Sequence, residues 1–192
     1  ANAGNDWRVS WEDLPETDNS GRAVTGYQVV EKAGSGWVQI GKPKVTHNDT
    51  TGTTTYFYTF TNSITTSYSV EKKWNPTPAT THDVTAWLYR TTDQSKVGTT
   101  SGERVPENEM ASGQNYRTAT LNNANSWKAT FTNLPKYDAN GQEYYYYALE
   151  LNGTTPIAQN GKLTLGTTDY EASYNWAADN TKTTVTNTTA IS

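Results

Sequence analysis

The chain carries the stretch NSWKATFTNLPKYDANG at residues 125–141, and a similar stretch, NDWRVSWEDLPETDNSG, at residues 5–21. Six positions match in the same order and at the same spacing: Trp7, Trp11, Leu14, Pro15, Asp18 and Gly21 correspond to Trp127, Phe131, Leu134, Pro135, Asp138 and Gly141. A repeat of fixed order indicates tandem copies of one structural module, stacked end to end.

The repeat continues beyond these stretches. After a slip of one residue, Glu31 corresponds to Glu150, and the segment TFTNS ending at Ser63 corresponds to VTNTT ending at Thr189. The two copies therefore share their C-terminal parts.

They differ in what precedes the shared part. Residues 64–126 lie ahead of Trp127, whereas only residues 1–6 lie ahead of the equivalent Trp7. We therefore expect residues 1–63 to be the C-terminal half of a module and residues 64–192 to be a complete one, as in a segment of a longer rod.

The composition favours β-structure. The chain has 13 Tyr and 7 Trp among its 192 residues, and Thr is abundant. β-branched and aromatic side chains suit a pleated, half-buried surface, and helical periodicity is missing beyond single turns. Short alternating segments separated by turn residues predict an all-β sandwich. Strands are expected at residues 7–11, 26–31, 37–39, 54–61, 67–74, 84–89, 126–132, 144–151, 170–176 and 183–187.

Composition also excludes several functions. The net charge is -4 and no run of Lys or Arg occurs, so the basic stripe that nucleic-acid binding needs is missing. No apolar stretch reaches membrane-spanning length. Without Cys, the chain has no disulfides, thiolate zinc sites or Cys nucleophiles. His47 and His82 fall in different modules, so neither a metal site nor a cofactor is expected, and Glu107 and Glu109 are interpreted as part of a solvated face.

Strand periodicity places one lysine on an apolar face, although a lone Lys on a strand is usually exposed. In residues 67–74, Lys72 falls on the same face as Val70 and Trp74, which predicts a buried side chain. By the same argument Asn187 shares a face with Val185. For Glu150 the face is ambiguous, because both alternating sets of residues 144–151 are apolar or aromatic.

Four motifs in order carry a family resemblance: VEKKW from Val70, the stretch at 125–141, YYALE ending at Glu150, and TVTNT from Thr184. Together they resemble the Cna B-type domain, the module of stalks in Gram-positive surface adhesins and of shafts in sortase-assembled pili. The resemblance covers residues 64–189, and residues 5–63 resemble the second half of the same domain. It implies tandem immunoglobulin-like or prealbumin-like sandwiches, the first incomplete at its N-terminus.

The resemblance also implies a chemistry. In this family a Lys on the first strand and an Asn on the last join spontaneously into an isopeptide amide with loss of ammonia, assisted by a carboxylic acid. By position these residues are Lys72, Asn187 and Glu150. Such a chain acts once on itself and is not a turnover enzyme. A buried but unreacted Lys72–Glu150 pair is the competing interpretation.

The half-module departs from the family pattern. Glu31 and Asn62 match the acid and the Asn, but the strand that would carry the Lys is absent. Asn62 thus awaits a Lys from a complementing strand segment.

The resemblance implies a structural segment of an extracellular, cell-wall-anchored surface protein. Its partners would be neighbouring modules, with a host ligand bound by other domains. The alternative is a carbohydrate-binding sandwich with Trp37, Trp87 and Trp176 as an exposed aromatic row, and with Trp7, Trp74 and Trp127 in the core. A third reading, direct ligand binding, rests only on the long polar segment at residues 91–114.

Overall fold

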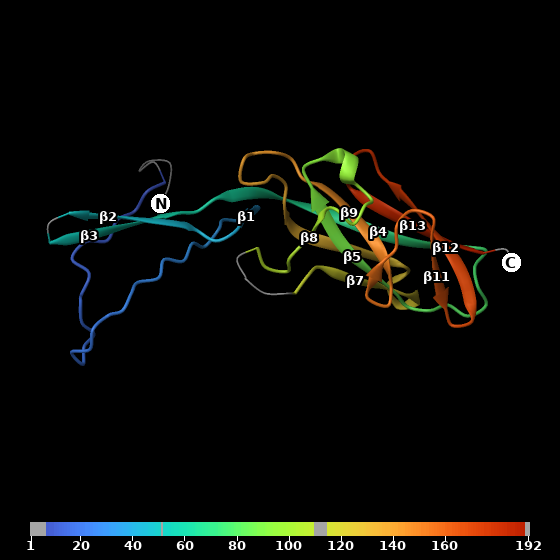
Figure 1. Ribbon diagram of the computed structural model, residues 1–192, viewed down its shortest axis with the longest axis horizontal. Helices are drawn as coiled ribbons and strands as arrows, with labels where there is room; N and C mark the ends of the chain where they lie inside the picture. The colour runs from blue at the N-terminus through green and yellow to red at the C-terminus, as the bar shows by residue number, and fades with distance from the viewer. Residues whose placement is uncertain (1–6, 51, 110–114, 191–192) are drawn as a thin grey trace. The chain divides into compact units, whose positions relative to one another are not determined.

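The computed structural model describes residues 7–50, 52–109 and 115–190 (Figure 1). The chain divides after Lys32 into two compact units. Nearly all regular structure lies in the second unit, from Ala33 onward, and it is almost entirely β-strand, as the composition predicts. No helix in the described ranges is long and apolar enough to cross a membrane.

The first sheet of the second unit has the order β1-β4-β13-β12-β11, with β8 also paired to β4. Strands β4 and β13 are parallel, and the other neighbours are antiparallel. The bounds are β1 Trp37–Gln39, β4 Asn62–Asn75, β8 Lys128–Pro135, β11 Gly161–Leu165, β12 Thr168–Trp176 and β13 Lys182–Thr189.

The second sheet has the order β10-β9-β5-β6, with β7 also paired to β5. Its strands are β5 Val84–Thr91, β6 Glu103–Arg104, β7 Thr118–Leu121, β9 Tyr145–Asn152 and β10 Thr155–Pro156. Two 3-10 turns, η2 (Gln94–Lys96) and η3 (Asn123–Asn125), and a separate hairpin of β2 (Lys44–Thr50) and β3 (Thr53–Thr59) complete the unit.

The core lies between these two sheets. β4 alternates as predicted, with Tyr68, Val70 and Lys72 buried and Lys73 exposed. β9 instead is buried on both faces over most of its length, because the segment after β5 covers its outer side. Tyr147 on that side donates a hydrogen bond of 2.7 Å to the carbonyl of Thr99. This double burial explains why the sequence did not assign a face to Glu150.

Two expected strands are wrong. Residues 7–11 and 26–31 form no strand, and the described part of the first unit holds a single bridge, between Thr17 and Ala23. Trp7, predicted to be core, is 71% exposed. A strand needs a partner for its backbone hydrogen bonds, and no such partner occurs within residues 7–32. The other expected strands are present, with ends that differ by at most three residues, except that β4 begins at Asn62, five residues before the expected start at residue 67.

The first unit nevertheless has the local backbone of its counterpart. Left-handed φ angles recur at equivalent positions: Trp7 (58°) and Trp127 (61°), Asp13 (52°) and Asn133 (55°), Gly21 (82°) and Gly141 (79°). Non-glycine residues rarely adopt this region. The repeat therefore encodes one local conformation twice.

A turn stapled by an aspartate recurs in the same way. The Asp18 carboxylate accepts hydrogen bonds from the backbone N–H groups of Ser20 and Arg22, and Asp138 accepts from Asn140 and Gln142. Such Asx turns are set by local sequence alone. Downstream, the Tyr27 hydroxyl donates to the carbonyl of Pro15, and that of Tyr146 to the carbonyl of Pro135.

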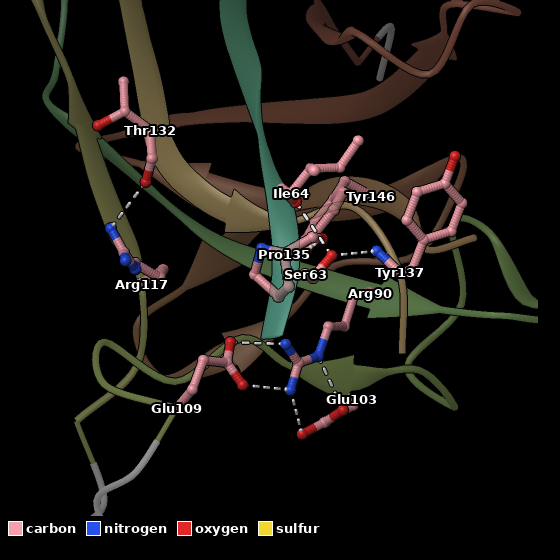
Figure 2. A network of polar contacts seen from close by, with 10 residues as sticks. All are labelled: Ser63, Ile64, Arg90, Glu103, Glu109, Arg117, Thr132, Pro135, Tyr137 and Tyr146. Carbon is pink, nitrogen blue, oxygen red and sulfur yellow. Dashed lines mark hydrogen bonds and ion pairs between the residues drawn. The ribbon is translucent and has the colours of Figure 1, made fainter. Parts of the chain in front are cut away.

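The expected module boundary, between Ser63 and Ile64, falls inside β4 rather than in a linker. β1 pairs with residues 62–64, and β8 pairs with the strand from Thr65 onward. The buried Ser63 hydroxyl accepts a hydrogen bond of 2.9 Å from the backbone N–H of Tyr137 (Figure 2). The division into modules stays a prediction, and the single strand β4 continues across the expected boundary.

Candidate functional site

Lys72 is buried on β4, an interior strand of the first sheet. β4 directs it inward with Tyr68 and Val70, and its side chain has 0% exposure. Its register partner on the parallel neighbour β13 is Val185. The alternation that predicted this burial is therefore confirmed, although an isolated Lys is rarely buried without a partner.

Asn187 lies on β13, two residues beyond Val185, and is fully buried. Two residues along a strand return to the same face, so Lys72 and Asn187 both point into the core from adjacent strands. β4 holds the first strand expected for the complete module, and β13 is the last strand in the described ranges, so the two residues lie near the two ends of that module.

Glu150 reaches the pair from β9 in the opposite sheet. Lys72 Nζ lies 3.2 Å from Glu150 Oε2, and Asn187 Nδ2 donates to Glu150 Oε1 at 2.9 Å. The Glu150 side chain is 1% exposed. Each oxygen of one buried carboxyl group thus holds one of the two predicted partners, and the structure brings all three residues together.

Burial sets the protonation of this cluster. It lowers the pKa of Lys72 to about 8 from an ordinary 10.5, against the opposing charge of Glu150. Burial likewise raises the pKa of Glu150, against the opposing effects of Lys72 and the Asn187 amide. Desolvation disfavours both charged forms, so the neutral amine and the neutral acid are more accessible here than in water.

One aromatic ring lies against the amine, and two more hold that ring in place. Lys72 Nζ lies 4.5 Å from the centroid of the Trp74 ring. Trp127 and Tyr170 contact that ring edge-on at 5.4 and 5.3 Å. The Trp74 ring thus contributes to the complete burial of the Lys72 side chain.

One polar atom of the cluster has no partner. Asn187 Oδ1 is buried and accepts no hydrogen bond from any described residue. An unsatisfied buried acceptor costs about 1–3 kcal/mol. The carbonyl is therefore poised to accept a proton or a hydrogen bond.

The equivalents in the half-module lie in different compact units. Glu31 is in the irregular first unit, and Asn62 begins β4 in the second. Their pairing stays a prediction.

A second buried polar cluster was missed by the sequence analysis. The Arg90 guanidinium, 5% exposed, makes two hydrogen bonds to Glu103 and two to Glu109, from 2.6 to 3.0 Å (Figure 2). It also lies over the Tyr144 ring at 4.6 Å. Glu109, expected on a solvated face, is only 10% exposed. The signal was present, because Arg90 shares a strand face with Leu88.

The aromatic row of the carbohydrate-binding alternative is not formed. Trp87 and Trp176 are partly buried and pack against the core, because Arg104 stacks on Trp87 at 3.3 Å and Tyr174 stacks on Trp176 at 5.7 Å. Trp37 alone of the three is exposed. Trp74 and Trp127 pack against the core as expected.

The segment of the third reading is only partly described. Its residues Val97 and Val105 pack against the core, and residues 110–114 lie outside the described ranges. Within those ranges no group of three His, Cys, Asp or Glu could hold a metal ion.

A β-sandwich in which β4 lies beside the last described strand, β13, with a buried Lys–Glu–Asn cluster between its sheets, defines a class of structural module. The chain belongs to the family of the Cna protein B-type domain, whose model matches residues 1–63 and 68–188. The resemblance read from the four motifs is confirmed. Domains of this family are structural modules of surface adhesins and pilins.

Relatives agree with this family. The chain is 28% identical over 186 residues to the collagen adhesin of Staphylococcus aureus. This match covers 90% of the chain and 13% of the adhesin. Two B repeat units of the collagen-binding protein of Staphylococcus aureus match 98% of the chain and 39% of that structure, at 22% identity and TM-score 0.40. The match to the pilus adhesin SpaC of Lactobacillus rhamnosus GG covers 70% of the chain and 14% of that structure, at 21% identity and TM-score 0.41. The chain thus spans a small part of these relatives.

Proposed function

We propose that the chain is a stalk or shaft segment of a Gram-positive surface adhesin or pilin, stiffened by an amide between Lys72 and Asn187 that Glu150 promotes. One observation carries the proposal: the two oxygens of the buried Glu150 carboxyl hold the amine and the amide, at 3.2 and 2.9 Å.

The reaction balances within these three side chains. The neutral Lys72 Nζ attacks Asn187 Cγ, forming the Nζ–Cγ bond, and the Cγ–Nδ2 bond breaks. Glu150 takes up one proton from Nζ and delivers one proton to the leaving nitrogen, which departs as ammonia. The acid is regenerated, and no oxidant, metal or cofactor enters.

The surroundings favour this chemistry. An amine attacks only when neutral, and burial lowers the pKa of Lys72 to about 8. A general acid must carry its proton, and burial raises the pKa of Glu150. Holding the reactants together supplies much of the rate, because an intramolecular reaction avoids the entropy of encounter.

The position of the bond suits a stalk. It joins β4 to the parallel strand β13, so tension entering at one end and leaving at the other passes through covalent bonds. The strands between residues 72 and 187 then carry little load. A chain without Cys has no disulfide for this purpose, and an amide resists reduction.

The wider setting follows from the family. We infer an extracellular, cell-wall-anchored protein in which neighbouring modules are the immediate partners and other domains bind the host ligand. The half-module, with Glu31 and Asn62, would be completed by a strand that supplies a Lys. No turnover of an external substrate is expected.

Two competitors remain. An unreacted Lys72–Glu150 ion pair would need its geometry to offset the desolvation of both charges. A carbohydrate-binding module would need an exposed aromatic row, and the packing of Trp87 and Trp176 against the core weakens that reading.

The intact mass of the denatured chain tests the proposal. We expect a deficit of one ammonia relative to the sequence mass, absent in Lys72→Ala and in Glu150→Ala. Lys73→Ala is the matched control, because Lys73 is the exposed neighbour on the same strand, and it should keep the deficit. Full sequence mass in the wild-type chain would refute the crosslink.

A further inference from the structure

Over residues 146–150, the edge of β9 that faces away from β5 is bonded to side chains of the opposite sheet, and only its C-terminal end pairs with the short strand β10. The backbone N–H groups of Tyr146, Ala148 and Glu150 donate at 2.9, 3.0 and 3.1 Å. Their acceptors are Asn180 Oδ1, Thr183 Oγ1 and the Tyr174 hydroxyl, from β12, β13 and the turn between them. Alternate residues along β9 are thus tied across the sandwich.

The last of these ties lies at the proposed acid. The Tyr174 hydroxyl accepts from the Glu150 N–H and donates to the carbonyl of Ile157 at 2.8 Å. The N–H of Ile157 in turn donates to the carbonyl of Glu150 at 2.8 Å. In a regular antiparallel pair, Glu150 and Ile157 would exchange both bonds directly. Here the hydroxyl is inserted in place of one of them.

Tyr174 also stands in line with the amine. Its register partner on β13 is Val185, and the register partner of Val185 on β4 is Lys72. The tyrosine is 7% exposed, and its ring stacks on Trp176. A rigid side chain on the row of Lys72 therefore fixes the main chain of Glu150.

We propose that Tyr174 is a positioning residue for the crosslinking reaction. Its hydroxyl holds the Glu150 backbone in the position from which one carboxyl group reaches both Lys72 and Asn187. The inference rests on the proposed function. Tyr174 touches no reacting atom and acts only through Glu150. An error of about 1 Å in such a placement can lower a rate by about 100-fold.

The test compares crosslinking rates in Tyr174→Phe and Tyr147→Phe. Tyr147 is the matched control, because it lies on the same strand as Glu150 and its hydroxyl bonds to Thr99 on the outer side. Each chain is made under denaturing conditions, in guanidinium chloride, so that it has not yet reacted. Dilution into buffer starts folding and crosslinking, and samples are quenched at intervals for measurement of their intact mass. We expect Tyr174→Phe to lose ammonia between about tenfold and 100-fold more slowly than wild type, and Tyr147→Phe to match wild type.

Two further measurements separate positioning from folding. The free energy of unfolding of both Phe variants is measured with denaturant in the Glu150→Gln background, where no crosslink forms. This measurement shows whether each variant folds, so that crosslinking rates are compared only between chains that fold. If Tyr174→Phe does not fold, 4-aminophenylalanine at position 174 restores a donor and an acceptor, and it should recover both fold and rate.

The outcomes are distinct. A folded Tyr174→Phe chain that reacts at the wild-type rate overturns the inference and leaves the proposed function intact. A 4-aminophenylalanine variant that folds without recovering the rate also overturns it. A wild-type chain that never loses ammonia overturns both proposals.

Discussion

Lys72 and Asn187 lie on adjacent parallel strands with their positions offset by two residues, since the register partner of Lys72 is Val185 and that of Asn187 is Trp74. Diagonal neighbours on one face are about 7–8 Å apart at the backbone, within reach only of long side chains. The four-carbon stem of Lys spans this offset toward the short Asn. The Glu150 carboxyl then meets both side chains from the opposite sheet.

The rate of crosslinking should show a plateau in pH. One proton on the Lys72–Glu150 pair allows the neutral amine and neutral acid to coexist, in a proportion that pH does not change. Below the raised pKa of Glu150 the pair gains a second proton, and above about pH 8, the lowered pKa of Lys72, it loses the last one. We expect the rate to fall about tenfold per pH unit on either side.

Dilution of the unfolded chain into buffers of different pH, followed by intact mass at intervals, measures this profile. A rate that keeps rising above pH 9 would mean that the free amine alone limits the reaction. Glu150 would then have no role as an acid.

The stability of an unreacted variant should depend on the protonation of Lys72 and Glu150. Asn187→Ala keeps Lys72 and Glu150 but removes the electrophile. Burial lowers the pKa of Lys72 from 10.5 to about 8, so the unfolded chain binds more protons between these values, and the free energy of unfolding rises with pH across them by about 3 kcal/mol. Burial raises the pKa of Glu150 above 4.5, so stability falls as pH rises from 4.5 through that raised value.

Urea unfolding of Asn187→Ala between pH 4 and pH 11 checks this prediction. The double variant Lys72→Met/Asn187→Ala is the control, and it should lack the alkaline rise. A flat profile in the single variant would mean that Lys72 is hydrated in the unreacted fold.

The family resemblance identified Lys72, Asn187 and Glu150 from the sequence, and strand periodicity agrees for the first two. Lys72 and Asn187 each lie on a strand with one buried face, and a period of two residues assigns the face. Glu150 lies on a strand buried on both faces, so its direction depends on the segment that covers β9. Tyr174 was beyond prediction, because its hydroxyl bonds to main-chain groups that any residue could supply.

The fold divides in the same way. The Asp18 and Asp138 turns are local, and both copies form them. The strands expected at residues 7–11 and 26–31 depend on partners distant in sequence, and the described part of the first unit holds none. Local sequence therefore specified the turns of both copies, but not strand pairing in the first.

Loss of Arg90 should destabilise the sandwich. Arg90→Met leaves the largely buried Glu109 carboxylate without its cation, and removing one member of a buried ion pair typically costs about 3–5 kcal/mol. Lys128→Met is the matched control, because Lys128 pairs with Glu71 at 3.7 Å on the surface and is 66% exposed. Exposed pairs contribute about 0–1 kcal/mol.

Urea unfolding of both variants in the Glu150→Gln background gives the comparison without any contribution from the crosslink. Equal, small losses would mean that Glu103 and Glu109 are satisfied by solvent once Arg90 is gone.

Pulling a single molecule from its two ends should reveal where the load runs. With the Lys72–Asn187 amide in place, about 115 residues between the two side chains stay outside the force path, so they add no length when the module is stretched. Glu150→Gln removes the acid with little change of shape, and its module should unfold with an extra contour length of about 400 Å.

Lys73→Ala keeps all three reacting residues and should extend like wild type. Force spectroscopy of each chain between two marker domains measures these lengths. A wild-type module that shows the full 400 Å gain would place β4 and β13 under shear without a covalent bond between them, and the stalk would then depend on hydrogen bonds alone.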